Sequence, residues 1–458
     1  MKKTIVVTAF MLLATSVCPA QTTPQERMEM ARRARSLAAG VNLISWDSSK
    51  PEGGWQRWWA RTEQMPGFAV DRTKGARGVP ALVLGGAGRR HVFGGWRYTI
   101  PAIEPNRYYV FRVTGEIKGV GDIRRSILCR VRWTGRDLPE SLAAEYINQF
   151  ERIEGQRVAF EQKFRAPVNA EGAVIELFVQ WAPQAEATFS EVAFEVGAPI
   201  VPRVVNIATV HWDGQGGGTP DENIAALAAL VDKAGAAGAD VVLLPEAVTV
   251  IGTGLDAHEA AETLPGDTFA AFGEQARNHR CYVIYGVNER DGEAVYSSAI
   301  IINRDGTLAG RYRKVQVTPQ EVAAGVVAGD FFRTFDLDFG RVGLLVGHDT
   351  AFAESARVQI LDGAEMLFVV MQREPRQQLE ARAMDNGVWI AASGVHTPSV
   401  IISPDGDVQG IAFGQIGDGV ALRKVNLAER YRRPYVGDWQ NQVIQQRRTD
   451  AYLKLVQE

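Results

Sequence analysis

The chain has 458 residues, of which 46% are hydrophobic and 22% are charged, and its formal net charge is −3. This composition is that of a soluble globular protein and excludes extensive disorder, and the length is sufficient for two or three domains. The small net charge and the lack of a long basic run give no reason to expect nucleic acid or an anionic membrane as a partner. We expect neither a cofactor nor a metal ion.

The N-terminus has the three regions of a secretory signal peptide over residues 1–20. Lys2 and Lys3 precede an apolar run, and small residues precede a cleavage site after Ala20. The apolar run is too short to span a bilayer, so we expect a secreted or periplasmic protein. Lipidation of Cys18 is a weaker alternative, because Val17 is bulkier than the residue that usually precedes a lipidated cysteine.

Residues 21–40 have a helix-forming composition with scattered arginines and are predicted to form a linker helix. The pattern changes over residues 41–201, where apolar and polar residues alternate in short runs that are separated by turn residues. This alternation predicts an all-β sandwich. The clearest of these runs are Tyr108–Val113, Ser126–Trp133, Val158–Phe164, Ala173–Trp181 and Ala187–Val196.

Seven of the ten tryptophans fall within this β-sandwich region. They are Trp46, Trp55, Trp58, Trp59, Trp96, Trp133 and Trp181. Tryptophan rings stack on sugars, so the module is a candidate for glycan binding, although filling the core is the simpler explanation for most of them. The arrangement loosely resembles the jelly-roll modules of secreted bacterial enzymes.

Pro202 marks a boundary, and residues 202–458 alternate between strands and helices. Helices are expected at Glu222–Ala237, Phe269–His279, Phe352–Leu361 and Gln377–Asp385, and buried strands include Asp240–Glu246, Val342–Val346 and Met366–Val370. Strand pairs that alternate with helix pairs predict an α+β fold in which two mixed sheets pack face to face with helices outside, a four-layer α-β-β-α sandwich.

Three strands of this region end next to candidate catalytic positions. Glu246 follows the run Val-Val-Leu-Leu-Pro, Lys314 follows Gly-Arg-Tyr-Arg, and Gly347 ends the strand that begins near Val342. A carboxylate at the end of a buried strand is desolvated, which raises its pKa and suits it to act as a general base. A nearby lysine stabilises a developing oxyanion.

Residues 203–455 resemble the nitrilase superfamily of carbon–nitrogen hydrolases. The resemblance rests on many short matches in chain order. They are Glu222-Asn223, Gly238–Glu246, Tyr312-Arg-Lys314 with Gln316, Glu321, Phe339–Gly343, Asp349 with Phe352 and Glu354, Gly363-Ala-Glu365, Ala381-Arg-Ala with Asn386, Ser399 with Pro404-Asp-Gly406, and Arg447–Tyr452. The resemblance implies Glu246 as general base, Lys314 as oxyanion stabiliser and Glu321 as the supporting second glutamate.

The chain departs from the resembled family at the nucleophile. Family members read Gly-x-x-Ile-Cys-Tyr/Trp-Asp, whereas this chain reads Gly343-Leu-Leu-Val-Gly-His-Asp349, so Gly347 takes the place of the cysteine. His348 and Asp349 beside it are candidates for ligand binding. Cys281 lies in a different, core-like strand, and Thr350 lies three residues beyond the corner, a displacement that would cost much of the rate. Water activated by Glu246 is a further alternative that forgoes covalent catalysis.

Three hypotheses follow for the function. The first is a non-hydrolytic protein that binds a small ligand with an amide, carbamoyl or carboxylate group. The second is an active amidase or nitrilase-type hydrolase with an unconventional nucleophile, and the third is a carbohydrate-binding protein for which the hydrolase-like fold is a scaffold. The resemblance also implies a homo-oligomer.

Overall fold

The computed structural model describes residue 29 and residues 37–136, 138, 143–214, 218–412, 419–433 and 436–455. The expected signal peptide lies outside these residues, and of the expected linker helix only Glu29 and residues 37–40 are described. Residues 37–40 end in a turn rather than a helix. In the described ranges, no helix is long and apolar enough to cross a membrane.

The chain divides into two compact units. The first comprises residues 1–140 and 149–198, and the second comprises residues 141–148 and 199–458. The division therefore falls close to the expected boundary at Pro202, but residues 141–148 group with the second unit instead of the β-sandwich. In that segment, the backbone N–H of Tyr146 donates to Asn441 Oδ1 at 2.8 Å, which ties the segment to helix α8 (Trp439–Gln445).

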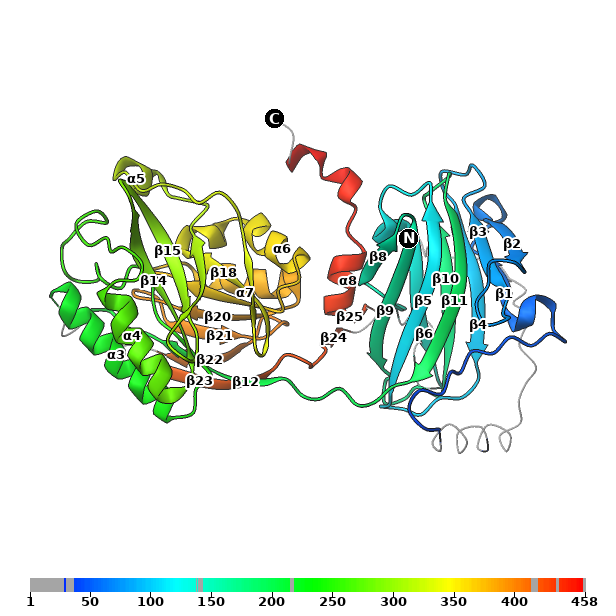
Figure 1. Cartoon of the computed structure of the whole chain (residues 1–458), viewed down its shortest axis with the longest axis horizontal. Helices are drawn as coiled ribbons and strands as arrows, with labels where there is room; N and C mark the ends of the chain where they lie inside the picture. Colours follow the sequence, from blue (N-terminus) through cyan, green and yellow to red (C-terminus); the bar gives the residue numbers. More distant parts are fainter. Residues whose placement is uncertain are drawn as a thin grey trace, which may run out of the picture. The chain divides into compact units, whose positions relative to one another are not determined.

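The first unit is an antiparallel β-sandwich, as the alternating pattern predicts (Figure 1). One sheet contains the strand order β1-β4-β10-β6 and the other the order β2-β3-β11-β5-β9-β8. The strands are β1 (Gln56–Trp59), β2 (Gly67–Asp71), β3 (Ala81–Gly85), β4 (Phe93–Ile100), β5 (Tyr108–Lys118), β6 (Ile127–Thr134), β8 (Phe150–Glu154), β9 (Arg157–Arg165), β10 (Gly172–Gln180) and β11 (Glu186–Val196). Alternate residues of these strands point inward, which places Phe111 and Phe194 in the core.

Most tryptophans of the first unit have structural contacts. Trp55, Trp96 and Trp133 are buried in the core. The Trp58 ring stacks on Phe178 with a centroid distance of 5.2 Å, and the Arg97 guanidinium lies 3.8 Å from the Trp58 ring centroid. A guanidinium over an indole ring is a favourable cation–π arrangement. The simpler explanation of the tryptophans, packing, therefore accounts for these four rings.

The second unit contains two six-stranded mixed sheets. The first has the order β16-β15-β14-β13-β12-β23 and the second β17-β18-β19-β20-β21-β22. The first sheet consists of β12 (Val204–Val210), β13 (Val241–Leu243), β14 (Tyr282–Asp291), β15 (Ala294–Ile302), β16 (Leu308–Arg313) and β23 (Val420–Asn426). The second consists of β17 (Thr334–Leu337), β18 (Gly340–Val346), β19 (Met366–Val370), β20 (Trp389–Ser393), β21 (Ser399–Ile402) and β22 (Val408–Ala412).

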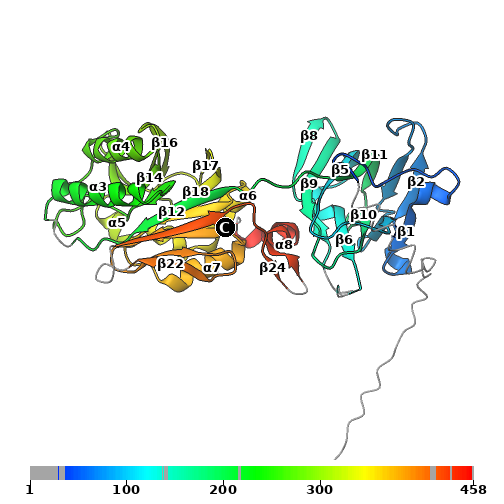
Figure 2. The ribbon, with the colours of Figure 1, turned by 90° about the horizontal axis from the view of Figure 1, so that it is seen from below.

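Helices cover the outer face of each sheet in the second unit. Helices α3 (Pro220–Ala236) and α4 (Asp267–His279) pack on the first sheet, and α6 (Ala353–Leu361) and α7 (Arg376–Asn386) pack on the second (Figure 2). Three apolar cores result, one under each helix pair and one between the sheets. The predicted four-layer α-β-β-α sandwich is thus confirmed.

Strand direction brings the expected site residues to one edge. Strands β12, β13 and β14 run parallel, as do β18, β19 and β20, and β16 runs parallel to β14 because each antiparallel pairing reverses the direction. Parallel strands end at the same edge of their sheet. Glu246, Lys314 and Gly347 each follow one of these strand ends, so the topology collects them.

Gln359 of α6 completes the edge of β18. Strand β17 pairs with β18 only as far as Gly343, so the next backbone amide has no strand partner on that side. The Gln359 side chain fills the gap, because its Oε1 accepts from Leu344 N at 2.8 Å and its Nε2 donates to Leu344 O at 2.9 Å. The glutamine is fully buried and therefore fixes the strand that leads to Gly347.

We predict that Gln359→Leu lowers the free energy of unfolding by about 2–4 kcal/mol, because it leaves a buried N–H and a buried carbonyl without partners. Chemical denaturation of the purified protein measures the loss. Gln377→Leu is the matched control, since Gln377 is exposed on the neighbouring helix α7. Equal stability of the two variants would contradict this role of Gln359.

Candidate active site

Glu246 stands just beyond strand β13 and is 4% exposed. Its backbone is held closely from behind, because a Cβ atom added at Gly286 of β14 would lie 2.6 Å from Glu246 Cα. Its N–H also donates to Met371 O of the second sheet at 3.4 Å. Both sheets therefore position this carboxylate, and residue 286 must be glycine for β14 to approach it.

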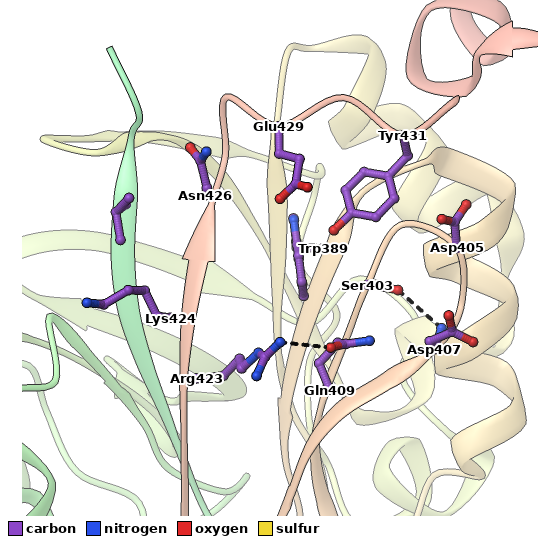
Figure 3. Close-up of a pocket in the computed structure, with 11 residues that line it drawn as sticks. Trp389, Ser403, Asp405, Asp407, Gln409, Arg423, Lys424, Asn426, Glu429 and Tyr431 are labelled. Atoms are coloured by element: carbon purple, nitrogen blue, oxygen red, sulfur yellow. Dashed lines mark hydrogen bonds between the residues drawn. The ribbon is translucent and has the colours of Figure 1, made fainter. Parts of the chain in front are cut away.

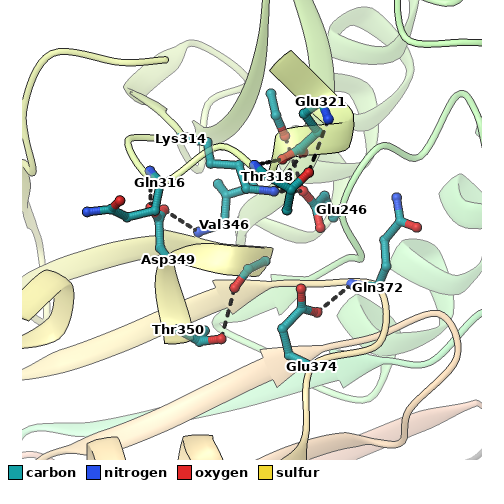
Figure 4. Close-up of polar contacts among 12 residues, drawn as sticks. Glu246, Lys314, Gln316, Thr318, Glu321, Val346, Asp349, Thr350, Gln372 and Glu374 are labelled. Atoms are coloured by element: carbon teal, nitrogen blue, oxygen red, sulfur yellow. Dashed lines mark hydrogen bonds and ion pairs between the residues drawn. The ribbon is translucent and has the colours of Figure 1, made fainter. Parts of the chain in front are cut away.

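Lys314 joins the two glutamates that were expected beside it (Figure 4). Its Nζ donates to Glu246 Oε1 at 3.0 Å and to Glu321 Oε1 at 2.7 Å, and its side chain is 3% exposed. The Ser297 hydroxyl donates to the same oxygen of Glu246 at 3.2 Å. The structure thus brings together Glu246, Lys314 and Glu321, and it adds Ser297, which the sequence analysis did not identify.

Glu321 is held by the start of the short helix α5 (Pro319–Ala323). Thr318 caps this helix: its hydroxyl accepts from Glu321 N at 3.1 Å, and Glu321 Oε2 accepts from Thr318 N at 2.7 Å. This reciprocal pair is a capping box, which fixes the glutamate side chain. One oxygen of Glu321 therefore holds the helix while the other holds Lys314.

The electrostatics of the three charged groups are coupled. Burial raises the pKa of Glu246 to about 7, with Lys314 opposing the rise and the carboxylates of Glu374 and Glu321 adding to it. Burial alone would lower the pKa of Lys314, but the two carboxylates outweigh burial and raise it. For Glu321, Lys314 and the Thr318 hydrogen bonds outweigh burial and lower the pKa. Glu246 is therefore the group that exchanges a proton near neutral pH.

Gly347 begins the 3-10 helix η3 (Gly347–Ala351) directly after β18, with φ of +41°. This left-handed conformation strains any other residue. A Cβ atom at this position would lie 2.6 Å from Glu246 Oε2 and 2.9 Å from Glu374 Oε1. The corner is therefore beside Glu246, as the sequence predicts, and two carboxylates converge on the place where a side chain would begin.

Glu374 is a member of the site that the sequence analysis missed. It follows strand β19, and its Oε2 accepts from the backbone N–H groups of Gln372 and Arg373, each at 3.0 Å. Its other oxygen, Oε1, points to the Gly347 corner, where a Cβ atom would lie 2.9 Å from it (Figure 4). The signal was present, because an acid shortly after a buried apolar strand is the same pattern that identified Glu246.

The side chains of His348 and Asp349 differ in burial and in their contacts. His348 is half-buried, and its ring meets Phe352 edge-on at 5.4 Å. Asp349 is fully buried: its Oδ2 accepts from Tyr312 OH at 2.7 Å and from Val346 N at 3.0 Å, and its Oδ1 accepts from Gln316 N at 2.8 Å. Asp349 thereby ties the Gly347 corner to the chain that follows Lys314.

The thiols lie elsewhere. Cys281 is fully buried in the apolar core under α3 and α4, and burial raises its pKa to about 11. Cys129 is buried in the first unit. The Thr350 hydroxyl donates to Gly347 O at 2.9 Å. Within the described ranges, no group of three or more His, Cys, Asp or Glu residues is arranged to hold a metal ion.

A buried glutamate and lysine at the strand ends of one sheet, with a second glutamate on α5, form an arrangement suited to carbon–nitrogen bond chemistry, and comparison with known proteins agrees. The family model described as carbon-nitrogen hydrolase matches residues 207–435, which is half of the chain. The chain belongs to the carbon–nitrogen hydrolase family.

Relatives of this carbon–nitrogen hydrolase domain include a nitrilase of Pyrococcus abyssi, 29% identical over 252 residues that cover 51% of this chain and 94% of that protein. The omega-amidase NIT2 of Homo sapiens is 29% identical over 188 residues that cover 38% of this chain and 68% of that protein. Among solved structures, an alanine mutant of the amidase of Nesterenkonia AN1 has a TM-score of 0.46 at 20% identity, covering 56% of this chain and 98% of that one.

We predict that Glu246 makes stability fall as the pH rises. Its folded pKa of about 7 exceeds the ordinary value of 4.5, so the folded protein holds the proton more tightly than the unfolded chain between these values. The destabilisation is absent below about pH 4.5 and complete above about pH 7, where it reaches about 3 kcal/mol. Chemical denaturation across this pH window should show the free energy of unfolding of Glu246→Gln rising relative to that of the parent.

The control for this pH dependence is Glu293→Gln, which neutralises an exposed carboxylate in the β14–β15 turn. Its stability should follow the parent at every pH. Parallel curves for the parent and Glu246→Gln would show that burial does not perturb the Glu246 carboxyl.

Proposed function

We propose that the carbon–nitrogen hydrolase domain binds a small primary amide at the Glu246–Lys314 site without hydrolysing it through a covalent thioester. The observation that carries this proposal is the position of Gly347, whose missing side chain would begin 2.6 Å from Glu246 Oε2. The family resemblance assigns the nucleophilic cysteine to this position. Without a thiol there, the general base has no thiol to activate and the thioester route is closed.

The charges of the site favour an amide over a carboxylate. Lys314 already shares its charge between Glu246 and Glu321, and Glu374 adds a third carboxylate near Gly347. The NH₂ group of a primary amide donates two hydrogen bonds, which match the converging oxygens of Glu246 and Glu374. An ammonium carries three N–H donors, so Lys314 has one left for the carbonyl oxygen of the amide. A ligand carboxylate would instead meet two like charges.

The names of the relatives support this ligand class. The omega-amidase and the nitrilase are named for amide and nitrile substrates, and one solved amidase of Nesterenkonia is described in complex with acrylamide. Carbamoyl and carboxylate compounds remain in the proposal as weaker ligands. We also propose export from the cytoplasm and assembly into a homo-oligomer, which the N-terminal sequence and the family resemblance respectively imply.

Hydrolysis by an unconventional route is the second candidate function. Ser297 favours it, because its buried hydroxyl already donates to Glu246 Oε1 and is therefore next to a general base. Attack by this hydroxyl on an amide carbonyl would pass its proton to Glu246, and Glu246 would return the proton to the leaving nitrogen so that ammonia departs and an ester remains. Water would then hydrolyse the ester to the carboxylic acid and free Ser297. Water activated by Glu246 would give the same products in a single step.

The parent protein should release no ammonia from a panel of primary amides and nitriles, while binding propionamide at least about tenfold more tightly than propionate because of the converging carboxylates. Calorimetry measures the binding and an ammonia assay the turnover. Gly347→Cys should release ammonia, with Gly347→Ala as the matched control for steric strain and Gly347→Cys combined with Glu246→Gln as the control for general-base catalysis. Ammonia release by the parent that disappears in Ser297→Ala or Glu246→Gln would establish the second candidate instead.

Glycan binding by the first unit is a further candidate, supported by a cavity of about 260 Å³. Trp46 and Trp55 line it together with the polar side chains of Asn42, Arg77 and Glu191. The Trp46 ring lies directly over Gly53, where a Cβ atom would stand 2.2 Å from the indole, so the backbone is shaped to seat this ring. Aromatic rings beside planar polar groups suit a sugar.

Trp46→Ala should abolish binding to any glycan that the parent retains on an array, because it removes the stacking surface. Trp181→Ala is the matched control, since Trp181 is 41% exposed and does not line the cavity. Loss of binding in the control alone would move the sugar site to Trp181, and a parent that retains no glycan would refute this function.

A further inference from the structure

The second unit has a cavity of about 340 Å³ at the opposite end of its sheets from Glu246. Trp389 is the first residue of β20 and Val204 the first residue of β12, and both line this cavity, whereas the candidate active site follows the last residues of parallel strands. The cavity is therefore distinct from the site described above. Its walls come from both sheets (Figure 3).

Trp389 provides a buried donor without a partner. The side chain is 6% exposed, and its indole Nε1 has no hydrogen-bond partner among the residues that the structure describes. Figure 3 shows the indole standing in the middle of the cavity, with its nitrogen toward the carboxylate of Glu429. A buried N–H that is left unpaired costs about 1–3 kcal/mol, so an acceptor is expected there.

Glu429 lies at the indole-nitrogen end of the cavity (Figure 3). Asp405, Asp407 and Glu429 line the cavity together with Tyr431, whose ring meets Trp389 edge-on at 6.0 Å. Only Asp405 has an ion pair, with Arg433 at 3.4 Å; Asp407 and Glu429 have none in the described part of the chain. Burial raises the pKa of Tyr431 to about 12, and Glu429 and Asp405 add to the rise whereas Arg423 opposes it. This end is thus suited to an ammonium group, which carboxylates and an aromatic ring bind together.

Arg423 provides a positive charge at the other end. It lies on β23, and its Nη2 donates to the neutral amide oxygen of Gln409 at 3.0 Å, so its charge is not neutralised by a carboxylate in the described residues. Figure 3 places Arg423 and Glu429 at opposite ends of the Trp389 ring, while Lys424 points away from them. A ligand that reaches both must therefore carry opposite charges at its two ends.

We propose that this cavity binds a dipeptide. Its terminal ammonium would meet Glu429 and the Tyr431 ring, its peptide carbonyl would accept from the Trp389 indole N–H, and its terminal carboxylate would meet Arg423. The proposal is independent of amide binding at Glu246, because no lining residue is shared.

Calorimetry with four probes tests the match: Ala-Ala, its C-terminal amide, its N-acetyl derivative and free alanine. Ala-Ala should bind at least about tenfold more tightly than each of the others, since each lacks one charge or the spacing. The Trp389 indole N–H, assigned in an ¹H–¹⁵N spectrum by its loss in Trp389→Phe, should shift on addition of Ala-Ala.

Substitutions at the exposed residues Glu429 and Arg423 complete the test. Glu429→Gln and Arg423→Gln should each weaken Ala-Ala binding at least about tenfold. Glu293→Gln neutralises an exposed carboxylate outside the cavity and should leave Ala-Ala binding unchanged. Glu246→Gln should also leave Ala-Ala binding unchanged. Failure of the parent to bind Ala-Ala, equal binding of the capped peptides, or an unmoved indole signal would overturn the proposal, and loss of binding in Glu246→Gln would assign the peptide to the other site.

Discussion

The buried ammonium of Lys314 is the interaction on which the carbon–nitrogen hydrolase domain depends. A charge this deep is tolerated only if opposite charges and hydrogen bonds replace water, and Glu246 and Glu321 supply them at 3.0 and 2.7 Å. Removing both partners would leave the buried ammonium uncompensated, which typically costs about 3–5 kcal/mol. The strand ends at residues 246 and 314 and the α5 turn at residue 321 are therefore fixed relative to one another whether or not the site has a ligand.

That fixed arrangement explains why a glycine at residue 347 changes the chemistry without dismantling the fold. The corner is held by Asp349, which bonds Tyr312, Gln316 and Val346, and by Gln359, which bonds Leu344. None of these contacts uses a side chain at residue 347. The glycine accepts the positive φ without strain, and Glu374 directs an oxygen toward the place where a side chain would begin. In the function that we propose, the corner presents two acceptor oxygens in place of a nucleophile.

The alternation of strands and helices predicted the four layers, and the family resemblance implied that Glu246, Lys314 and Glu321 share one site with Gly347. The sequence analysis did not identify Glu374, whose place beside Gly347 depends on the loop after β19, or Ser297, whose place beside Glu246 depends on the register of β15. The same limit applies to Asp349. Its place beside Gly347 made it a candidate for binding, yet its two oxygens accept three hydrogen bonds from the protein, which only the folded backbone reveals.

Parallel strands give the domain two chemically different edges. At the carboxyl ends, Lys314 is paired with two glutamates. The remaining oxygens of Glu246 and Glu374 are placed to accept hydrogen bonds from the neutral ligand that we propose. At the amino ends, Arg423 and Glu429 face the same cavity without pairing within the described residues, so their charges are available to a dipolar ligand. An isolated charge binds its complement more strongly than a paired one does. The two edges should therefore select different ligands, neutral at one and zwitterionic at the other, because pairing rather than the number of charges decides what each can bind.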